Sequence, residues 1–157
     1  MPKNLINNFN HYCNSKNFEI NQNQIEVMKK LQDYYKNNFK SFFFNAFTRE
    51  YPQKSFYLFG DVGVGKTMIL DFFFDHIKEK KLRLHFNEFM LNFHDFVHKR
   101  KDKKEENVVN LFVKNLKLKA SLIYFDEFQV TNIVDAMILG KLFECMFQEN
   151  IKIILTS

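Results

Sequence analysis

Two kinds of apolar pattern alternate along the chain, and together they predict an α/β fold. Short, continuous apolar runs at residues 55–59, 82–86, 121–125 and 151–157 are typical of strands that are buried in a parallel sheet. Between these runs, apolar residues recur three or four positions apart, which is the spacing of a helix with one buried face. Strands that alternate with helices predict a parallel sheet with helices on both faces.

The helical spacing also predicts which side of each helix is buried. Residues up to about position 21 show little periodicity, and the first helix follows them. Asn132 and Asp135 are expected to begin the last helix. The expected buried positions are Ile25, Met28, Leu31 and Tyr35, then Ile69, Phe72, Phe73 and Ile77, then Phe89, Phe93, Phe96 and Val97, then Val109, Phe112, Val113 and Leu116, and finally Ile133, Ala136, Met137, Gly140, Phe143 and Phe147.

Composition narrows the class of protein. The chain has 157 residues, enough for one domain with a core, and its 21 Phe residues are attributed to genome bias rather than to function. A net charge of +5 is modest and could reflect Lys-rich coding as easily as an anionic partner, so charge alone does not decide between them. Cys13 and Cys145 lie far apart without metal-ligand spacing, and no apolar run approaches the ~18 residues of a membrane span. We therefore expect a cytoplasmic protein without a disulfide framework.

A glycine-rich loop connects the first expected strand to the next helix. Gly60, Gly65, Lys66 and Thr67 match the pattern G-x-x-x-x-G-K-S/T, and Gly63 is a further glycine within it. Glycines let the backbone wrap closely around phosphate oxygens, and the N-terminus of the helix adds the positive end of its dipole. Because the strand before and the helix after are the context that this motif requires, we predict a phosphate-binding P-loop.

The positions of this loop have expected roles. Lys66 would reach the β- and γ-phosphates, and the Thr67 hydroxyl would bind the Mg²⁺ that bridges them. ATP is preferred over GTP because the chain has no guanine-reading N-K-x-D segment. The residues expected to contact the nucleotide are Gly60, Asp61, Val62, Gly63, Val64, Gly65, Lys66, Thr67 and Met68.

Two carboxylates follow the third expected strand. The apolar run of residues 122–125 ends in Asp126 and Glu127, which places both acids at the carboxyl end of a strand, where ligands bind in open α/β sheets. This is a Walker B arrangement. We expect Asp126 to hold Mg²⁺ through its water shell, and Glu127 to orient and deprotonate the water that attacks the γ-phosphate. Glu127 and Lys66 are therefore the predicted catalytic residues, and Thr67 and Asp126 the predicted metal ligands.

Three other features have simpler interpretations. His94 and His98 lie one helical turn apart, but no third zinc ligand is evident, so a surface pair is favoured. The basic run that begins at Lys99 is followed by acidic residues and contains no aromatics. Residues 99–106 are therefore expected to form a solvated loop rather than a contact with nucleic acid or acidic membrane lipid. The aromatic run at residues 42–47 is expected to pack beneath the first helix rather than against a partner.

Several motifs of the chain resemble those of the ZapE family of cell-division ATPases, a branch of AAA+-like proteins with mitochondrial relatives. Residues 126–139 read D-E-F-Q-V-T-N-I-V-D-A-M-I-L, close to the family's D-E-F-Q-V-T-D-I-A-D-A-M-I-L. Residues 85–90, H-F-N-E-F-M, resemble its H-F-H-E-F-M, and residues 60–67 resemble its G-G-V-G-R-G-K-S/T. The departures keep the phosphate-binding Lys and both acids; they are Asp61, Val64, Asn87, Asn132 and Val134.

The resemblance implies a fold, an activity and partners. The fold would be an AAA+-like sheet of strand order 5-1-4-3-2, and the activity would be ATP hydrolysis that remodels protein partners. Bacterial members act with the division machinery near the inner membrane, so a peripheral membrane position is implied. No nucleic-acid partner is expected, and self-association is left open.

The resemblance covers only the front part of the family. We expect residues 1–52 to form a helical preface and residues 53–157 a partial ATPase core, because the family continues after T-S-N and this chain ends at Ser157. The sensor Asn, the arginine finger, the fifth strand and the helical lid would come later, so little hydrolysis and an exposed apolar edge at residues 56–59 are expected. Two alternatives stay open: a decayed copy that binds nucleotide weakly without turnover, and a protein-interaction module.

Overall fold

The computed structural model describes residues 5–40, 54–61, 63, 65–100 and 105–157. The chain divides into two compact units, Met1–Lys78 and Glu79–Ser157, and each is described by itself. The predicted aromatic run at residues 42–47, the loop positions Val62 and Val64, and most of the basic run lie outside the described residues.

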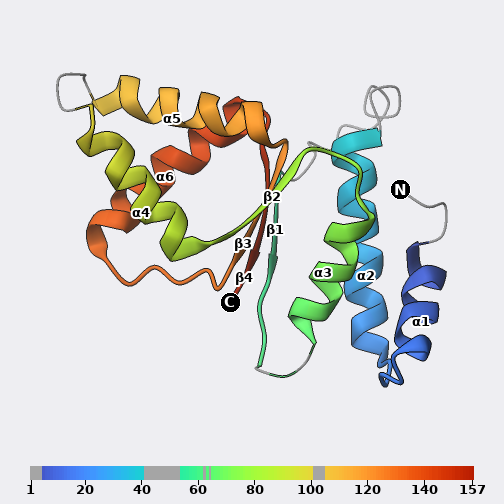
Figure 1. The fold of residues 1–157 in the computed structure, drawn as a ribbon. Helices are drawn as coiled ribbons and strands as arrows, with labels where there is room; N and C mark the ends of the chain where they lie inside the picture. The colour runs from blue at the N-terminus through green and yellow to red at the C-terminus, as the bar shows by residue number, and fades with distance from the viewer. Residues whose placement is uncertain (1–4, 41–53, 62, 64, 101–104) are drawn as a thin grey trace. The chain divides into compact units, whose positions relative to one another are not determined.

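The first unit contains α1 (Leu5–Ser15), α2 (Gln22–Tyr35), the π-helix η1 (Lys36–Lys40), β1 (Ser55–Leu58) and α3 (Lys66–His76) (Figure 1). Within it, α2 contacts both α1 and α3. A helix, α1, forms within the segment up to position 21, where the sequence showed little periodicity. Leu5, Phe9 and Cys13 recur every four residues and are fully buried, so they form the apolar stripe of α1.

The start of α2 is fixed by a capping box. The Asn21 side chain accepts a hydrogen bond from the Gln24 backbone N–H, and the Gln24 side chain accepts one from the Asn21 N–H. Met28 and Leu31 are buried as predicted, but Gln24 takes the buried position that was predicted for Ile25. The polar box therefore forms one end of the buried face of α2.

Aromatic contacts join the two N-terminal helices to α3. Phe72 of α3 meets Phe9 edge-on, with ring centroids 5.2 Å apart, and Tyr12 at the same separation. Phe73 of α3 meets Tyr35 of α2 edge-on, at 6.3 Å. Edge-to-face pairs of this kind each stabilise by about 0.5–1.5 kcal/mol beyond the burial of their area. The helix that follows the P-loop is thus packed against both α1 and α2.

The second unit is a parallel sheet with helices. It contains β2 (Lys81–His85), α4 (Phe86–His98), α5 (Glu105–Lys119), β3 (Leu122–Asp126), α6 (Ile133–Gln148) and β4 (Lys152–Thr156). β3 lies between β2 and β4 and is parallel to both, with Phe125 opposite Leu84 on one side and Leu155 on the other. This pairing confirms the 4-3-2 part of the predicted order, and the position of the first strand stays a prediction.

One hydrophobic core holds this second unit together. The helices α4, α5 and α6 gather on one face of the three strands (Figure 1), where buried residues of α4 and β3 interlock. The Phe89 and Phe125 rings meet edge-on with centroids 4.7 Å apart, and Phe89 also contacts Phe112 of α5. Burying one such ring stabilises the fold by about 1.5–3 kcal/mol. The Phe-rich composition is therefore used as core.

The inner face that the sequence predicted for the last helix was wrong at four of its six positions. Ile133 and Met137 of α6 are 79% and 77% exposed, and Ala136 and Gly140 are exposed too. The side of α6 that faces the core is formed instead by Leu139, Leu142, Cys145 and Met146, with Phe143 and Phe147 partly buried beside them. The error arose because α6 carries apolar residues around its whole circumference, so spacing alone selected no single face. The predicted N-terminus was right, since the Asn132 side chain caps it.

The burial of the first strand and the ends of two elements differ from the prediction. The first strand was expected to be buried, but Tyr57 of β1 is 49% exposed, and Phe59, just after the strand, is 72% exposed. Phe86 was assigned to the second strand but begins α4. The charged loop was expected to run to residue 106, but α5 already begins at Glu105.

In the part of the chain that the structure describes, helices long and apolar enough to cross a membrane are not found.

Candidate functional site

The P-loop lies in the first unit, between β1 and α3, as the motif predicts. Gly63 and Gly65 have φ angles of +86° and +82°. These left-handed conformations are disfavoured for residues with a Cβ, which explains glycine at both positions. Gly65 is also the N-cap of α3 and offers no side-chain hydrogen bond to its first turn. The helix therefore begins without the acceptor that usually satisfies these N–H groups, which suits an anion.

The side chain of Lys66 folds back over the loop. Its Nζ donates to the carbonyl oxygens of Gly60 and Asp61, at 2.5 and 2.9 Å. The ammonium group thus bridges the start of the loop to the start of the helix and is held at the loop rather than extended into solvent. Thr67 is exposed and Met68 is half-buried. The predicted contact residues Val62 and Val64 fall outside the described residues.

A pocket of about 290 Å³ adjoins this loop inside the first unit. One side comes from the α1–α2 connection and the first turn of α2, and the other from the P-loop and α3; the lining residues are Phe18, Glu19, Asn21, Gln24, Gly63, Gly65 and Met68. The Gln24 amide nitrogen lies only 3.1 Å from where a Cβ on Gly65 would be. Sequence reasoning missed Phe18 and Gln24, although the capping-box spacing of Asn21 and Gln24 was a visible signal.

The two predicted carboxylates lie in the second unit at the end of β3. Asp126 is the last residue of the strand and is buried, whereas Glu127 is exposed and has a φ of +53°. The N–H of Phe128 then donates to the Thr156 carbonyl at 2.6 Å, which ties the chain to β4 just after the turn. A left-handed glutamate is uncommon and is held here by the pairing on either side of it.

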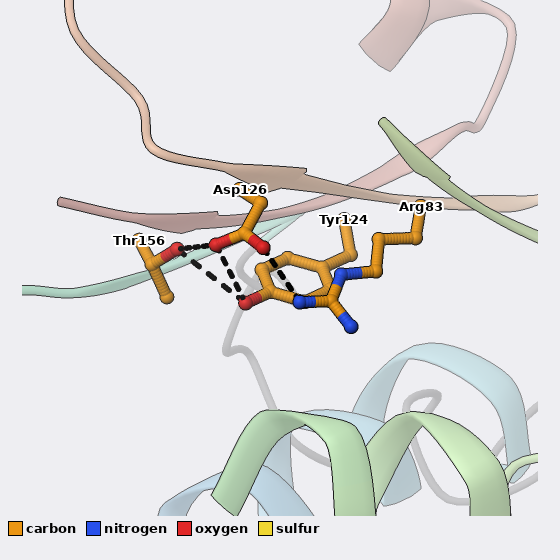
Figure 2. A network of polar contacts seen from close by, with 4 residues as sticks. All are labelled: Arg83, Tyr124, Asp126 and Thr156. Atoms are coloured by element: carbon orange, nitrogen blue, oxygen red, sulfur yellow. Dashed lines mark hydrogen bonds and ion pairs between the residues drawn. The ribbon is translucent and has the colours of Figure 1, made fainter. Parts of the chain in front are cut away.

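Side chains from all three strands of the second unit meet at Asp126, as Figure 2 shows. The Arg83 Nη2 from β2 lies 2.6 Å from the Asp126 Oδ2. The other carboxylate oxygen, Oδ1, accepts from the Tyr124 and Thr156 hydroxyls, each at 3.2 Å. The Arg83 guanidinium also lies over the Tyr124 ring, 5.1 Å from its centroid. Asp126 is therefore held from both neighbouring strands.

This network sets the protonation of its members. Burial alone would raise the pKa of Asp126, but the hydrogen bond and positive charge of Arg83, aided by Thr156 and Tyr124, bring that pKa below its ordinary value. Burial raises the pKa of Tyr124 to about 12, with the Thr156 hydrogen bond opposing the shift and the Asp126 charge adding to it. At neutral pH the network thus contains an ionised carboxylate and a protonated tyrosine.

Sequence reasoning missed Arg83, Tyr124 and Thr156. Their common signal is strand register: Tyr124 is two residues before Asp126 and so shares its face, and Arg83 is the residue opposite Tyr124 on β2. Tyr124 also pairs with Ile154 on β4, two residues before Thr156. A lone Arg between two leucines in an otherwise apolar run was a visible hint, but the register that gives it meaning was not.

The residues at the end of β3 fit a magnesium ion that is bound through water. Mg²⁺ prefers oxygen ligands and keeps several waters, and an ionised carboxylate beside a threonine hydroxyl offers that chemistry. Both oxygens of Asp126 already accept hydrogen bonds, which favours contact with a hydrated ion over direct coordination.

One histidine of the α4 pair, His94, contacts an aspartate of α6. The His94 Nε2 lies 2.7 Å from the Asp135 Oδ1, which joins α4 to the first turn of α6. Within the described ranges, no group of three metal-binding side chains is formed. The contact connects His94 to the segment that follows the carboxylates.

The chain has the features of P-loop nucleotide-binding proteins. These are a strand, a loop with left-handed glycines, a helix that begins at Lys66, and a parallel α/β sheet with acids at a strand end. The comparisons with known proteins give the family. The model of the AFG1-like ATPase family matches residues 9–157, and the chain belongs to that family.

Curated relatives agree with this assignment. Lactation elevated protein 1 homolog B of Danio rerio is 37% identical over 120 residues, covering 70% of this chain and 24% of the relative. Cell division protein ZapE of Escherichia coli is 34% identical over 111 residues, covering 70% of this chain and 29% of the relative. The resemblance to the ZapE family is thereby confirmed, and an ATPase-type function is supported at the level of the family. The chain spans about a quarter of the length of these relatives.

Proposed function

We propose that this chain binds ATP with Mg²⁺ through residues 60–68 and forms the nucleotide-binding part of an ATPase. The observation that carries the proposal is the conformation of the loop. Gly63 and Gly65 adopt left-handed angles, and Lys66 folds its ammonium onto the loop's own carbonyls. The first turn of α3 has no side-chain cap, so its backbone N–H groups are suited to an anion, and Lys66 supplies a positive charge beside them.

Each predicted side chain has a proposed role in the reaction. Lys66 would exchange its carbonyl partners for the β- and γ-phosphate oxygens, and Thr67 would supply a hydroxyl to the metal. Asp126 would accept hydrogen bonds from the metal's water, and Glu127 would orient and deprotonate the attacking water. Bound magnesium would neutralise charge that develops on the phosphates. The exposure of Glu127 leaves its carboxylate accessible to such a water.

We further propose that the pocket beside the loop receives the base of the nucleotide. It is concave, it borders the phosphate loop, and it contains both an aromatic ring, Phe18, and an amide, Gln24. A purine needs these two kinds of contact, a face for stacking and polar groups along its edge. Adenine stays the predicted base, in keeping with the ATPase family to which the chain belongs.

A protein-interaction role is the second candidate, and one surface favours it. Ile133, Val134 and Met137 lie in the first half of α6 and are 79%, 54% and 77% exposed. Apolar residues that cluster on a surface often mark a site of association. By similarity to the protein named cell division protein ZapE, we propose partners from the division machinery. A cytoplasmic site of action, peripheral at the inner membrane, stays a proposal that rests on the family resemblance. The sequence-based division into residues 1–52 and 53–157 also stays a proposal.

Titration with a fluorescent ATP analogue tests nucleotide binding. Lys66→Ala should weaken binding about 10- to 100-fold, because it removes charged hydrogen bonds worth about 1.5–3 kcal/mol. Lys30→Ala is the matched control, since Lys30 is an exposed lysine of α2 in the same unit. Equal affinities for the wild type and the Lys66 variant would refute the proposed site.

Phosphate release measures turnover separately from binding. Glu127→Gln should abolish any release while it leaves nucleotide binding intact, because the change removes the base but keeps the shape of the side chain. Binding in the wild type without release would support the alternative of a nucleotide-binding module that does not hydrolyse. Release that persists in Glu127→Gln would refute the role assigned to Glu127.

A further inference from the structure

We propose that Arg83 is a positioning residue, which holds the Asp126 carboxylate in the orientation that receives the magnesium of a bound nucleotide. The inference rests on the proposed nucleotide function and deepens it. Nothing in the P-loop motif or the acidic motif includes this residue, because Arg83 lies on a different strand from either.

The contacts of Asp126 are unequal, and Arg83 supplies the strongest. The guanidinium contacts Oδ2 at 2.6 Å and is charged, whereas Oδ1 accepts from two neutral hydroxyls at 3.2 Å. Hydrogen bonds between charged groups are roughly twice as strong as neutral ones. Among the described residues, Arg83 is the only cation that is paired with this carboxylate. The orientation of Oδ2 therefore depends on Arg83.

Arg83 is itself held in place. Its strand position is opposite Tyr124, and its guanidinium lies over the ring of that tyrosine while the tyrosine hydroxyl bonds to Asp126 (Figure 2). The three side chains thus form a closed arrangement in which moving one disturbs the other two. A side chain that was present only to neutralise charge would not need to be fixed on an aromatic ring.

Loss of Arg83 would have two opposing effects on a nearby cation. Without its partner on Oδ2, the carboxylate could rotate about its Cβ–Cγ bond around two weaker contacts, and partners that orient a metal ligand typically contribute 10–100-fold in metal affinity. Removing a positive charge would instead strengthen the attraction for Mg²⁺. Since the Arg83 side chain is 37% exposed and its guanidinium is directly paired with an opposite charge, solvent and Asp126 reduce its repulsion. Orientation should therefore dominate.

The experiment compares the affinity for a fluorescent ATP analogue in Mg²⁺ with the affinity in EDTA. For Arg83→Gln we expect an unchanged affinity in EDTA and a gain from Mg²⁺ that is about 10-fold smaller than in the wild type. Arg83→Lys, which keeps the charge, should recover part of the gain. Asp126→Asn should lose it. The control is Arg100→Gln, because the Arg100 guanidinium lies 3.7 Å from the centroid of the Phe96 ring in the same unit.

Each result bears on the inference. A gain from Mg²⁺ that is unchanged or larger in Arg83→Gln overturns it, and so does an equal loss of affinity in Mg²⁺ and in EDTA, which would indicate general damage. If Arg83→Gln does not fold by circular dichroism, Arg83→Lys is the substitute, and its gain from Mg²⁺ should be smaller than that of the wild type; an equal gain would overturn the inference. Wild-type binding that is absent, or unaffected by Lys66→Ala, refutes the proposed function and this inference together.

Discussion

The ring of Phe9 meets the ring of Phe72 edge-on, with centroids 5.2 Å apart, and this contact connects α1 to the helix that follows the P-loop. Phe9 is fully buried. An N-terminal helix that sequence periodicity did not reveal therefore packs directly on the element that begins with Lys66.

Replacing Phe9 should destabilise the first unit. Phe9→Ala removes a fully buried ring, and truncations of this kind cost about 3–5 kcal/mol of unfolding free energy because they leave a cavity. Urea unfolding would measure the loss. His11→Ala, at an exposed position of the same helix, should change stability by less than about 0.5 kcal/mol. A Phe9 variant as stable as the His11 variant would contradict the packing described for α1.

The glycines should respond to alanine with opposite signs. Gly63→Ala should destabilise by about 1–2 kcal/mol, because the φ of +86° strains an L-residue although no atom obstructs the new methyl group. Gly65→Ala should cost more, since its methyl would also press on the Gln24 amide at 3.1 Å. Gly140→Ala should stabilise by about 0.5–1 kcal/mol, because Gly140 is helical with open space around it. Thermal unfolding of the three variants measures these effects, and a Gly63→Ala protein as stable as Gly140→Ala would exclude the loop conformation.

Acid should remove the contribution of Asp126 to stability. Its pKa in the folded chain lies below the ordinary 3.8, so the ionised carboxylate stabilises the fold above that pH. The stabilisation disappears as pH falls from 3.8 through the folded pKa. Relative to Asp126→Asn, the wild type should hold its advantage in unfolding free energy at pH 6 and lose it progressively below 3.8. An advantage that stayed constant down to pH 3 would contradict this. In an Arg83→Gln background the advantage at pH 6 should be smaller.

Two methionines of α6 test which side of the helix is buried. Met146→Ala should cost about 2–5 kcal/mol, since Met146 is fully buried, whereas Met137→Ala should cost almost nothing because Met137 is 77% exposed. The variants share one helix and one substitution, so helix propensity cancels in the comparison. Denaturant unfolding of both would decide the matter. Equal losses would restore the face that the sequence pattern had favoured.

Local signals in the sequence predicted most elements and the motif residues. The P-loop residues lie within one short segment and the acids at positions 126 and 127 are adjacent, so each motif could be proposed from the sequence without knowledge of the fold. The α1 stripe was missed because it has one apolar residue per turn, Leu5, Phe9 and Cys13, set among polar residues. The α6 face was missed for the opposite reason, an excess of apolar positions.

The partners of Asp126 could not be predicted from local pattern. Arg83 is 43 positions away in the chain and Thr156 is 30 positions away. Their convergence follows from the parallel register of three strands, and a shift of one residue in either pairing would turn the partner side chain to the other face. Capping residues such as Gln24 fall between these cases: the local box is visible in sequence, but its approach to Gly65 is not.

The buried thiol of Cys13 in α1 can report how often this helix opens. Cys13 is fully buried, and burial raises its pKa, so the group is both shielded from reagents and reluctant to form the reactive thiolate. A thiol dye can therefore reach it only in the moments when α1 separates from its neighbours. In a chain with Cys145→Ser, the rate of Cys13 labelling measures how often α1 opens. A ligand that stabilises the first unit should lower this rate without contacting the sulfur.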